Sequence, residues 1–274
     1  MHPSSYAMRN THVSLRRVVE RAPDTRGQTQ ALMRGLRILR ILVDADKPMS
    51  ATEIARICGL HQSSVSRILA TLTEEGYVRK ETYRGFAPDY GILALAVTAQ
   101  SRFDLMEKPR QVLAACAERS PGLTVSLCML WRQQMIYFLR TQAGRRPTPF
   151  EGDGYPMHLS SPALRFIADM PNAEGEALLA HSRERFGWSR PTERVPKTAK
   201  STIKTARSLV VYDCLVLTDW GEQDHVSAAI PLRPHNRHPL ALALTGPKSL
   251  ASEDKIRLLL HEMRREVEAV LDTA

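Results

Sequence analysis

Two groups of residues in the first third of the chain have side chains suited to nucleic-acid chemistry. The first is a run of hydrogen-bonding residues, His61, Gln62, Ser63, Ser64, Ser66 and Arg67, and the second is a basic cluster, Arg79, Lys80, Tyr83 and Arg84. Short polar side chains and arginine can contact base edges in a DNA major groove, which is about 12 Å wide. Cationic side chains on a small hairpin can hold the phosphate backbone. The two groups together predict a DNA-binding surface.

Periodic apolar residues predict the first of three helices that would position these groups. Leu32, Leu36, Leu39 and Val43 recur at steps of three and four residues, with other aliphatic residues widening the stripe. This spacing is typical of an amphipathic helix, here expected over residues 28–44.

Capping signals and spacing predict the second and third helices. Ser50 and Glu53 have the spacing of a capping box, and Gly59 is placed for the left-handed residue that closes a short helix. Apolar residues from Val65 to Leu72 recur at i, i+3, i+4 and i+7, so the polar run is expected to face outward. A strand over residues 77–80 and a very short returning strand at 86–87 complete a winged helix-turn-helix.

A three-helix packing module with a merely solvated outer face is the alternative interpretation of this region. The basic hairpin argues against it, because a packing module does not need such a cluster of cations. With Arg34 of the first helix added, the run and the cluster form the predicted DNA-binding set.

The charge of the chain agrees with a polyanionic partner. The 274 residues carry a formal net charge of +9, of which +5 lies in residues 1–90. Basic side chains that neutralise phosphates release condensed counterions, which favours binding to DNA. Residues 1–27 lack periodicity, so a solvated arm is as good an interpretation there as direct contact.

Other features restrict the class of protein. The sequence has no run of 18 apolar residues and no signal-peptide core, so we expect a cytoplasmic protein without a membrane partner. Its four cysteines are widely separated, which is typical of a reduced protein without a structural zinc site.

The second half mixes helix and strand patterns, which gives an α+β fold overall. A linking helix is expected from residue 90 to about 103, and a hairpin, helices and further strands follow. Residues 183–200 are interpreted as a polar loop and residues 202–211 as a helix. The predicted divisions are a basic arm over 1–27, the DNA-binding domain over 28–90, a linker helix over 91–105 and a second domain over 106–274.

The segment from Ala55 to Leu72, continued by Gly76-Tyr77-Val78, resembles the DNA-binding signature of IclR-type bacterial transcriptional regulators. Residues 155–164, 200–203, 226–232 and 240–247 are similar to later segments of that family. The resemblance implies a GAF-like effector-binding domain joined by a helix to the DNA-binding domain. It also implies a homodimer or homotetramer that binds a double-stranded DNA operator and a small-molecule effector.

The resemblance also implies an effector site. The matching positions are His158, Ser160, Ser161, Asp219, Trp220 and Ser227. Pro162 replaces a glycine of the family, and Asp219-Trp220 departs from its commonest acidic loop. Trp220 before an acidic stretch and Ser227 in the next strand resemble the branch that controls the breakdown of hydroxyphenylpropionate and related aromatic acids, so a small, aromatic carboxylic acid is the expected effector.

Two of these positions have a plainer interpretation. His158 could pair with a carboxylate, because histidine changes charge in the physiological pH range, but a hydrogen-bonded structural histidine is the commoner case. Trp220 could stack on an aromatic effector, but a lone tryptophan in a small domain more often belongs to the core.

An enzyme is the main competing class of protein. The sequence contains none of the G-x-S-x-G, G-x-x-x-x-G-K-[ST] or G-x-G-x-x-G motifs, and Arg265 stands where a zinc helix would need its second histidine. We therefore predict no catalytic residues, metal or cofactor. An RNA- or protein-binding module with a winged helix is a further alternative, which the effector-like second half disfavours.

Overall fold

The structure is a computed structural model that describes residues 29–100, 102–148, 154–233 and 238–272. The chain divides into two compact units, with the boundary between Glu107 and Lys108. Each unit is described by itself. The arm predicted over residues 1–27 lies outside the described residues.

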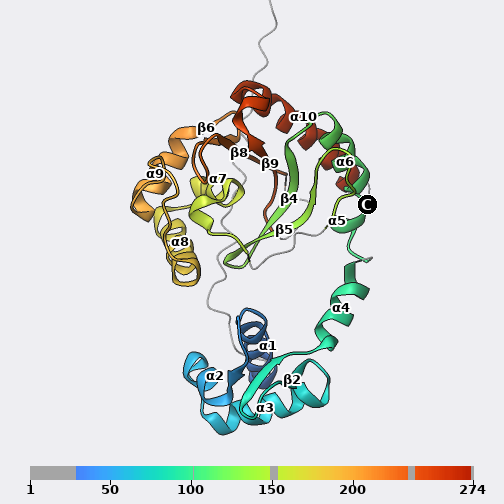
Figure 1. Cartoon of the computed structure of the whole chain (residues 1–274), viewed down its shortest axis with the longest axis vertical. Helices are drawn as coiled ribbons and strands as arrows, with labels where there is room; N and C mark the ends of the chain where they lie inside the picture. Colours follow the sequence, from blue (N-terminus) through green and yellow to red (C-terminus); the bar gives the residue numbers. More distant parts are fainter. Residues whose placement is uncertain (1–28, 101, 149–153, 234–237, 273–274) are drawn as a thin grey trace, which may run out of the picture. The chain divides into compact units, whose positions relative to one another are not determined.

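The N-terminal unit is a helix-turn-helix with a small sheet (Figure 1). Its elements are α1 (Gln30–Val43), β1 (Met49–Ser50), α2 (Ala51–Cys58), α3 (Gln62–Glu74), β2 (Val78–Lys80), β3 (Gly85–Pro88), α4 (Tyr90–Gln100) and α5 (Asp104–Glu107). The strand order is β1-β3-β2, and both pairs are antiparallel. The returning strand is thus stabilised on both sides, because β1, which periodicity did not predict, pairs with it.

Local signals placed the two helices of the motif correctly. The Ser50 hydroxyl accepts a hydrogen bond from the Glu53 amide, and the Glu53 carboxylate accepts one from the Ser50 amide. Gly59 has a φ of 65° and ends α2 in the left-handed conformation. This sharp end leaves two residues before α3 begins, so α3 turns away from α2 and presents its outer face.

The inward face of α1 differs from the predicted stripe. Gly35, Ile38 and Leu42 are buried, whereas Leu32 and Leu36 are 63% and 54% exposed. The side of α1 that carries Leu32 and Leu36 does not face the core. The side with Gly35 does, because the small glycine lets α1 approach Ile68 of α3 closely. The exposed leucines are therefore left without a partner in the described part of this unit.

The helix α4 is apolar on all sides, and none of its residues is buried. It ends at Gln100, slightly before the predicted end near 103, and the single-turn helix α5 follows. A helix of this composition normally lies against other apolar surface.

The C-terminal unit is built on one six-stranded antiparallel sheet with the order β5-β4-β9-β8-β7-β6 (Figure 1). Its strands are β4 (Thr124–Trp131), β5 (Gln134–Thr141), β6 (Val210–Val211), β7 (Cys214–Thr218), β8 (His225–Pro231) and β9 (Leu240–Pro247). Its helices are α6 (Arg110–Glu118), α7 (Ser161–Asp169), α8 (Asn172–Phe186), α9 (Ala199–Leu209) and α10 (Glu253–Asp272), with the 3-10 turns η1 (Met157–Leu159) and η2 (Lys248–Leu250).

Helices cover both faces of the sheet. α6 and α10 contact each other and pack against β4, β5 and β7–β9, and α7 packs against the sheet together with α9. The core between α7–α9 and the sheet includes Cys128, Leu164, Ile203 and Leu217. The prediction of an α+β fold with an N-terminal helix-turn-helix is confirmed.

Two predicted boundaries in this unit were wrong. α8 continues to Phe186, and the loop is limited to residues 187–198, because Thr198 and Ser201 form a capping box that begins α9 earlier than expected. Val210 and Val211 leave the helix to pair with β7 as an edge strand. β-branched residues are favoured in a strand, so pairing prevailed over helix continuation.

Candidate DNA-binding face and effector cavity

The polar run lies on the outer face of α3, as its spacing requires. His61, Gln62, Ser63, Ser66 and Arg67 are exposed, and Ser64 is half-buried. On the inner face Val65 and Leu69 have no exposed surface. Packing of the inner face therefore fixes the rotation of α3 and holds the polar side chains outward.

The four residues of the basic cluster lie on the hairpin that follows α3, here called the wing (residues 78–88). Lys80 Nζ lies 5.6 Å from the centre of the Tyr83 ring, and Arg84 Cζ lies 5.7 Å from it. Arg79 instead donates to the Glu81 carboxylate and to the Pro88 carbonyl oxygen. Two of the three cations are thus presented next to an aromatic ring, and the third is held within the wing.

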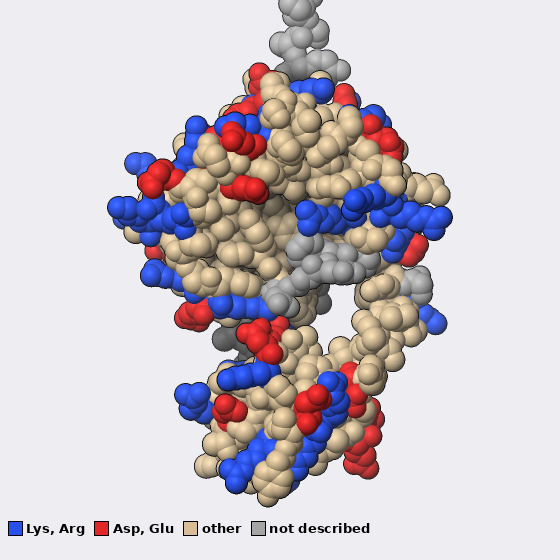
Figure 2. All heavy atoms as spheres, in the orientation of Figure 1, with Lys and Arg blue, Asp and Glu red and all other residues tan. Residues whose placement is uncertain are grey.

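Arg34 lies on α1, away from these groups in sequence, and donates to Gln30 Oε1 at 3.2 Å. The residue is exposed, and this bond keeps its guanidinium along α1. In the view of Figure 2, Lys and Arg side chains gather in a band along the wing strands of the N-terminal unit.

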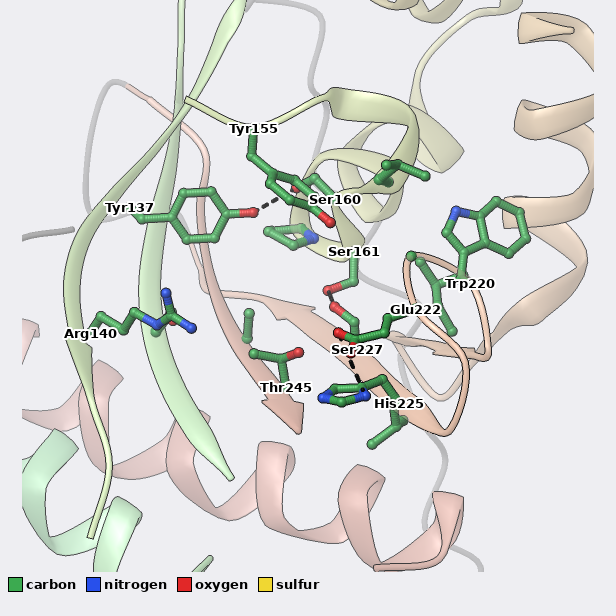
Figure 3. A pocket seen from close by; sticks show the side chains of 17 residues that line it. Tyr137, Arg140, Tyr155, Ser160, Ser161, Trp220, Glu222, His225, Ser227 and Thr245 are labelled. Carbon is green, nitrogen blue, oxygen red and sulfur yellow. Dashed lines mark hydrogen bonds and ion pairs between the residues drawn. The ribbon is translucent and has the colours of Figure 1, made fainter. Parts of the chain in front are cut away.

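The C-terminal unit contains a cavity of about 220 Å³, far more than the about 10–15 Å³ that one water needs. Its wall is formed by side chains from β4, β5, β7–β9, the start of α7 and the β7–β8 loop (Figure 3). The residues that line it are Ser126, Tyr137, Arg140, Tyr155, Leu159, Ser160, Ser161, Pro162, Leu217, Trp220, Gly221, Glu222, His225, Val226, Ser227, Ala243 and Thr245.

An irregularity in β5 brings Tyr137 and Arg140 to the same wall. Tyr137 pairs with Cys128 and Arg140 with Ser126, so β5 contains one residue more than β4 over this stretch. Residues two apart on β4 share a face, and the extra residue in β5 keeps its two side chains on that face as well. Both side chains point into the cavity (Figure 3).

The N-terminus of α7 meets the cavity opposite this wall. Ser160 is the N-cap residue of α7, and its hydroxyl accepts from the Ala163 amide. Tyr137 Oη and Ser160 Oγ are 2.9 Å apart, and Ser161 Oγ and Ser227 Oγ are 2.7 Å apart. Burial raises the pKa of Tyr137, so its hydroxyl stays protonated and can donate to Ser160.

Ser126 adds a further polar side chain to the cavity wall. The residue is 3% exposed and lines the cavity, and its hydroxyl has no hydrogen-bond partner among the described residues. A serine hydroxyl can both donate and accept, so this side chain can bond to a molecule in the cavity.

Two predicted effector residues do not line the cavity. The His158 ring stacks on Trp188 with centroids 4.3 Å apart, and its Nε2 donates to the Ser189 carbonyl oxygen at 2.8 Å. Burial lowers the pKa of His158, so the ring is neutral. The Asp219 carboxylate is bound by Lys248 Nζ at 2.8 and 2.9 Å. Neither residue lines the cavity, and His158 Nε2 and the Asp219 carboxylate are already bonded within the fold.

Ser160, Ser161, Trp220 and Ser227 do lie together in the cavity wall. Trp220 is only 3% exposed, and its Nε1 donates to the His158 carbonyl oxygen. Its side chain therefore belongs to the hydrophobic core and also lines the cavity. The sequence did not predict Tyr137, Arg140 or Tyr155 as cavity residues. Nothing in it indicated which face of β5 lies toward the cavity, or that the segment containing Tyr155 lies at the cavity wall.

The β7–β8 loop, residues 219–224, forms the rim of the cavity and is anchored by Lys248. Besides its contacts with Asp219, Lys248 Nζ lies 3.0 Å from Asp224 Oδ1. Asp219 and Asp224 both have a positive φ, of 54° and 59°. Hydrogen bonding to Lys248 lowers the pKa of Asp219. One cation thus holds both ends of the loop that carries Trp220 and Glu222.

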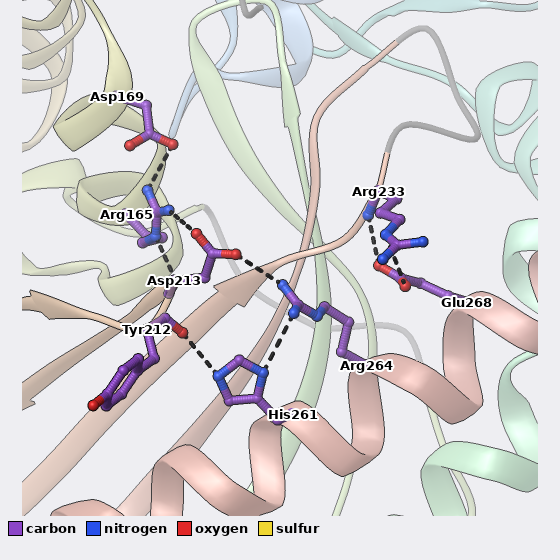
Figure 4. A network of polar contacts seen from close by, with 8 residues as sticks. All are labelled: Arg165, Asp169, Tyr212, Asp213, Arg233, His261, Arg264 and Glu268. Carbon is purple, nitrogen blue, oxygen red and sulfur yellow. Dashed lines mark hydrogen bonds and ion pairs between the residues drawn. The ribbon is translucent and has the colours of Figure 1, made fainter. Parts of the chain in front are cut away.

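A polar network ties α7 to α10 through the β6–β7 turn (Figure 4). Arg165 of α7 donates from Nε to the Asp213 carbonyl oxygen at 2.6 Å. Arg264 Nη1 lies 3.2 Å from Asp213 Oδ2, and His261 Nε2 donates to the Tyr212 carbonyl oxygen at 2.8 Å. Tyr212 and Asp213 are held at positive φ by these contacts. The position of α7, and of the serines at its start, is thereby fixed against the sheet.

The described residues contain no cluster of three or more histidines, cysteines or acids that could hold a metal ion. No helix in the described ranges is long and apolar enough to cross a membrane. The fold and the exposed face of α3 define a helix-turn-helix protein of the DNA-binding class, with a second unit that contains a ligand-sized cavity.

Comparison with known proteins agrees with this class. Residues 31–82 match the family model of the IclR helix-turn-helix domain. The chain is 26% identical over 249 residues to the acetate operon repressor of Salmonella typhimurium, covering 86% of each chain. It is 25% identical to the transcriptional repressor IclR of Escherichia coli over 252 residues, covering 87% of each chain.

Solved structures show the same fold. An IclR family transcriptional regulator from Brucella abortus matches with a TM-score of 0.69 at 24% identity, covering 93% of this chain and 95% of that one. A regulator from Alicyclobacillus acidocaldarius matches with a TM-score of 0.62 at 18% identity, covering 89% and 99%. Residues 31–82 thus have the signature of an IclR-type helix-turn-helix domain, and the chain is similar over most of its length to transcriptional repressors of bacteria.

Proposed function

We propose that this regulator controls a catabolic operon in response to a small carboxylic acid, preferably an aromatic one, bound in the cavity of the C-terminal unit. In this proposal residues 28–90 bind the operator, residues 91–105 couple the domains, residues 106–274 bind the effector, and the protein acts in the cytoplasm. The observation that carries the proposal is the set of donors around the cavity: the α7 N-terminus, Arg140 and the unpartnered Ser126 hydroxyl.

These donors favour an anion. At the start of α7 the Ala163 amide is already capped by Ser160 and Pro162 has no N–H, so the Ser161 amide and the helix dipole supply the partial positive charge there. The start of α7 is at the cavity wall, and Arg140 adds a full positive charge from β5. A carboxylate has two oxygens that can accept from both sources, and hydrogen bonds to charged groups are worth about 1.5–3 kcal/mol.

The remaining wall favours an aromatic body. Tyr137, Tyr155 and Trp220 present rings to the cavity, and Leu159, Leu217 and Val226 add aliphatic surface. Aromatic pairs contribute about 0.5–1.5 kcal/mol beyond the area that they bury. A ring attached to a carboxylate therefore matches both the polar and the apolar parts of the wall.

Exposed apolar surface on the N-terminal unit supports a homodimer. On α4, Leu93, Leu95 and Val97 are each at least 58% exposed. On α1, Leu32 and Leu36 are exposed as well. Exposed apolar residues of this number on one helix are often covered by another chain, and two-fold dimers are the commonest arrangement. A dimer would also present two copies of α3 to a palindromic operator.

The regulatory step requires only that the effector bind more tightly to one arrangement of the two DNA-binding domains than to the other. The α7–α10 network holds α7 against the sheet, so an effector bound between the start of α7 and the β7–β8 loop would act mainly on that loop.

The proposal is tested by combining DNA binding with a ligand screen. A gel shift with DNA from upstream of the protein's own gene should show a complex, and an effector should change its affinity. A thermal-shift screen of aromatic and short aliphatic carboxylates should identify that effector, because a bound ligand raises stability with the logarithm of its concentration.

Two serine variants make the screen specific to the cavity. Ser126→Ala should reduce the shift caused by the effector, whereas Ser208→Ala, at an exposed serine of α9, should leave it unchanged. An effector shift that is equal in both variants would contradict binding in this cavity. Absence of any DNA complex, with and without the acids, would contradict the proposed regulator.

A further inference from the structure

The tip of the wing carries an aromatic side chain that folding does not use. Tyr83 is 84% exposed, more than any other large hydrophobic residue in the described part of the chain. Its ring lies within 6 Å of two cationic groups, at 5.6 Å for Lys80 and 5.7 Å for Arg84. A solvent-exposed ring with two neighbouring cations is suited to a ligand that is anionic and also offers hydrogen-bonding edges, such as DNA.

The turn that presents Tyr83 is closed and preorganised. The Thr82 hydroxyl accepts from the Gly85 amide at 2.8 Å, and the Gly85 carbonyl oxygen accepts from the Glu81 amide at 2.9 Å. A Cβ atom on residue 85 would lie 2.5 Å from Thr82 Oγ1 and 2.9 Å from Pro48 Cβ, so the close approach depends on glycine. The tip therefore does not have to order itself when it binds.

The wing is also fixed beside α3. The Tyr77 amide donates to the Leu72 carbonyl oxygen at 2.9 Å, and the Asp89 amide donates to the Tyr77 carbonyl oxygen at 2.9 Å. These bonds hold both ends of the hairpin against the C-terminal end of α3. When α3 lies in a major groove, a hairpin held at this end of the helix lies beside the adjacent backbone.

We propose that Tyr83, at the wing tip, selects A·T pairs in the minor groove next to the major-groove segment bound by α3. This inference rests on the proposed DNA-binding function. The minor groove is about 6 Å wide, which admits a tight turn but not a helix. A·T tracts have the narrowest minor groove and the strongest negative potential, which attracts Lys80 and Arg84.

The chemistry of the groove floor gives Tyr83 its selectivity. A·T pairs show only acceptors there, adenine N3 and thymine O2, whereas guanine adds an amino group that projects into the groove. A tyrosine hydroxyl can donate to the acceptors, and the guanine amino group would occupy the space that the ring needs to reach them. A wing that bound phosphates alone would show no such preference, because phosphate contacts are independent of sequence.

Modified base pairs separate minor-groove reading from major-groove reading. Footprinting with the full-length protein on the DNA upstream of its own gene first locates the A·T pairs beside the α3 segment. These pairs are then replaced in turn by G·C, by 2,6-diaminopurine·T and by inosine·C. Diaminopurine·T keeps the major groove of A·T but adds the minor-groove amino group. Inosine·C has the major groove of G·C without that amino group.

We expect G·C and diaminopurine·T to weaken binding by roughly tenfold, and inosine·C to bind like A·T. Tyr83→Ala should bind all four duplexes with similar affinity, and its thermal unfolding should match that of the unchanged protein because the side chain is exposed. Tyr212→Ala is the matched control, since this tyrosine is 70% exposed in the C-terminal unit, and it should keep the discrimination.

Three outcomes would overturn the proposal. Equal affinity for A·T and diaminopurine·T would show that the amino group is not sensed, and discrimination that persists in Tyr83→Ala would assign the selectivity to another residue. In both cases DNA binding, and so the proposed function, would stand. A protein that gives no footprint at all would overturn both proposals.

Discussion

Tyr137 and Arg140 point to the same side of the sheet, although three positions along a regular strand would place them on opposite sides. Their β4 partners, Cys128 and Ser126, are only two residues apart, so β5 accommodates one extra residue between them. The bulge delivers an aromatic hydroxyl and a guanidinium to one cavity wall, facing the start of α7. This arrangement is the geometric basis of the proposed carboxylate site.

Arg140→Gln should weaken binding of the effector by about 10- to 100-fold, because a charge-assisted hydrogen bond to a carboxylate is worth about 1.5–3 kcal/mol. Isothermal titration calorimetry with the acid identified in the screen measures the change. Arg145→Gln, at an exposed arginine that does not line the cavity, is the control. Similar affinity in the two variants would mean that Arg140 does not contact the carboxylate.

Lys248→Met should loosen the cavity rim and lower both thermal stability and effector affinity at neutral pH. The folded protein holds the pKa of Asp219 below its ordinary value of 3.8, so this carboxylate stabilises the fold above that pH and its contribution is lost as the pH falls through the lowered pKa. The difference in stability between the unchanged protein and Lys248→Met should therefore be largest near neutral pH and shrink below about pH 4. Thermal unfolding across pH 2.5–7 checks this, and a constant difference would contradict the role of the Lys248–Asp219 pair.

Arg67→Ala should reduce binding to the specific site by about 1–3 kcal/mol if the guanidinium contacts a base, with little effect on nonspecific DNA. Competitive gel shifts with specific and random duplexes measure the ratio of the two affinities. Lys255→Ala, at an exposed lysine of α10, should leave both affinities unchanged. A proportional loss on both duplexes would assign Arg67 to the phosphate backbone.

Glu81→Gln should strengthen DNA binding to all sequences. Glu81 holds the Arg79 guanidinium in the wing, and loss of its charge frees a cation for a phosphate. One added phosphate contact steepens the slope of log K against log salt by about 0.9. Glu75→Gln removes a nearby exposed charge without an arginine partner in the described residues, and the comparison separates release of Arg79 from a general change in charge. Equal slopes for the two variants would show that Arg79 stays within the wing.

Leu93→Glu combined with Val97→Glu should convert the protein to a monomer, because charges would replace the exposed apolar surface of α4. Size-exclusion chromatography with light scattering gives the mass directly. Leu258→Glu, at a leucine of α10 that is 59% exposed, should keep the mass of the unchanged protein. A dimer that survives the double substitution would place the interface elsewhere.

Residues close together in the sequence were enough to predict the helix-turn-helix and its polar outer face. The capping box at Ser50, the left-handed Gly59 and the apolar period of α3 are local signals, and each acts within about one helical turn. The preference for an inner face at Val65 and Leu69 follows from the same few residues, so no distant contact was needed to predict that the polar side chains of α3 face outward.

Contacts between distant segments decided the rest. The inward side of α1 depended on the fit of Gly35 against Ile68, and hydrophobicity alone favoured the wrong side. The His158 ring stacks on Trp188 and the Asp219 carboxylate pairs with Lys248, and both partners are distant in the sequence. The cavity wall needed the bulge in β5, whose position depends on pairing with β4 rather than on any pattern within β5. A local period carries no information about such pairings, because their free energy comes from segments that only folding brings together.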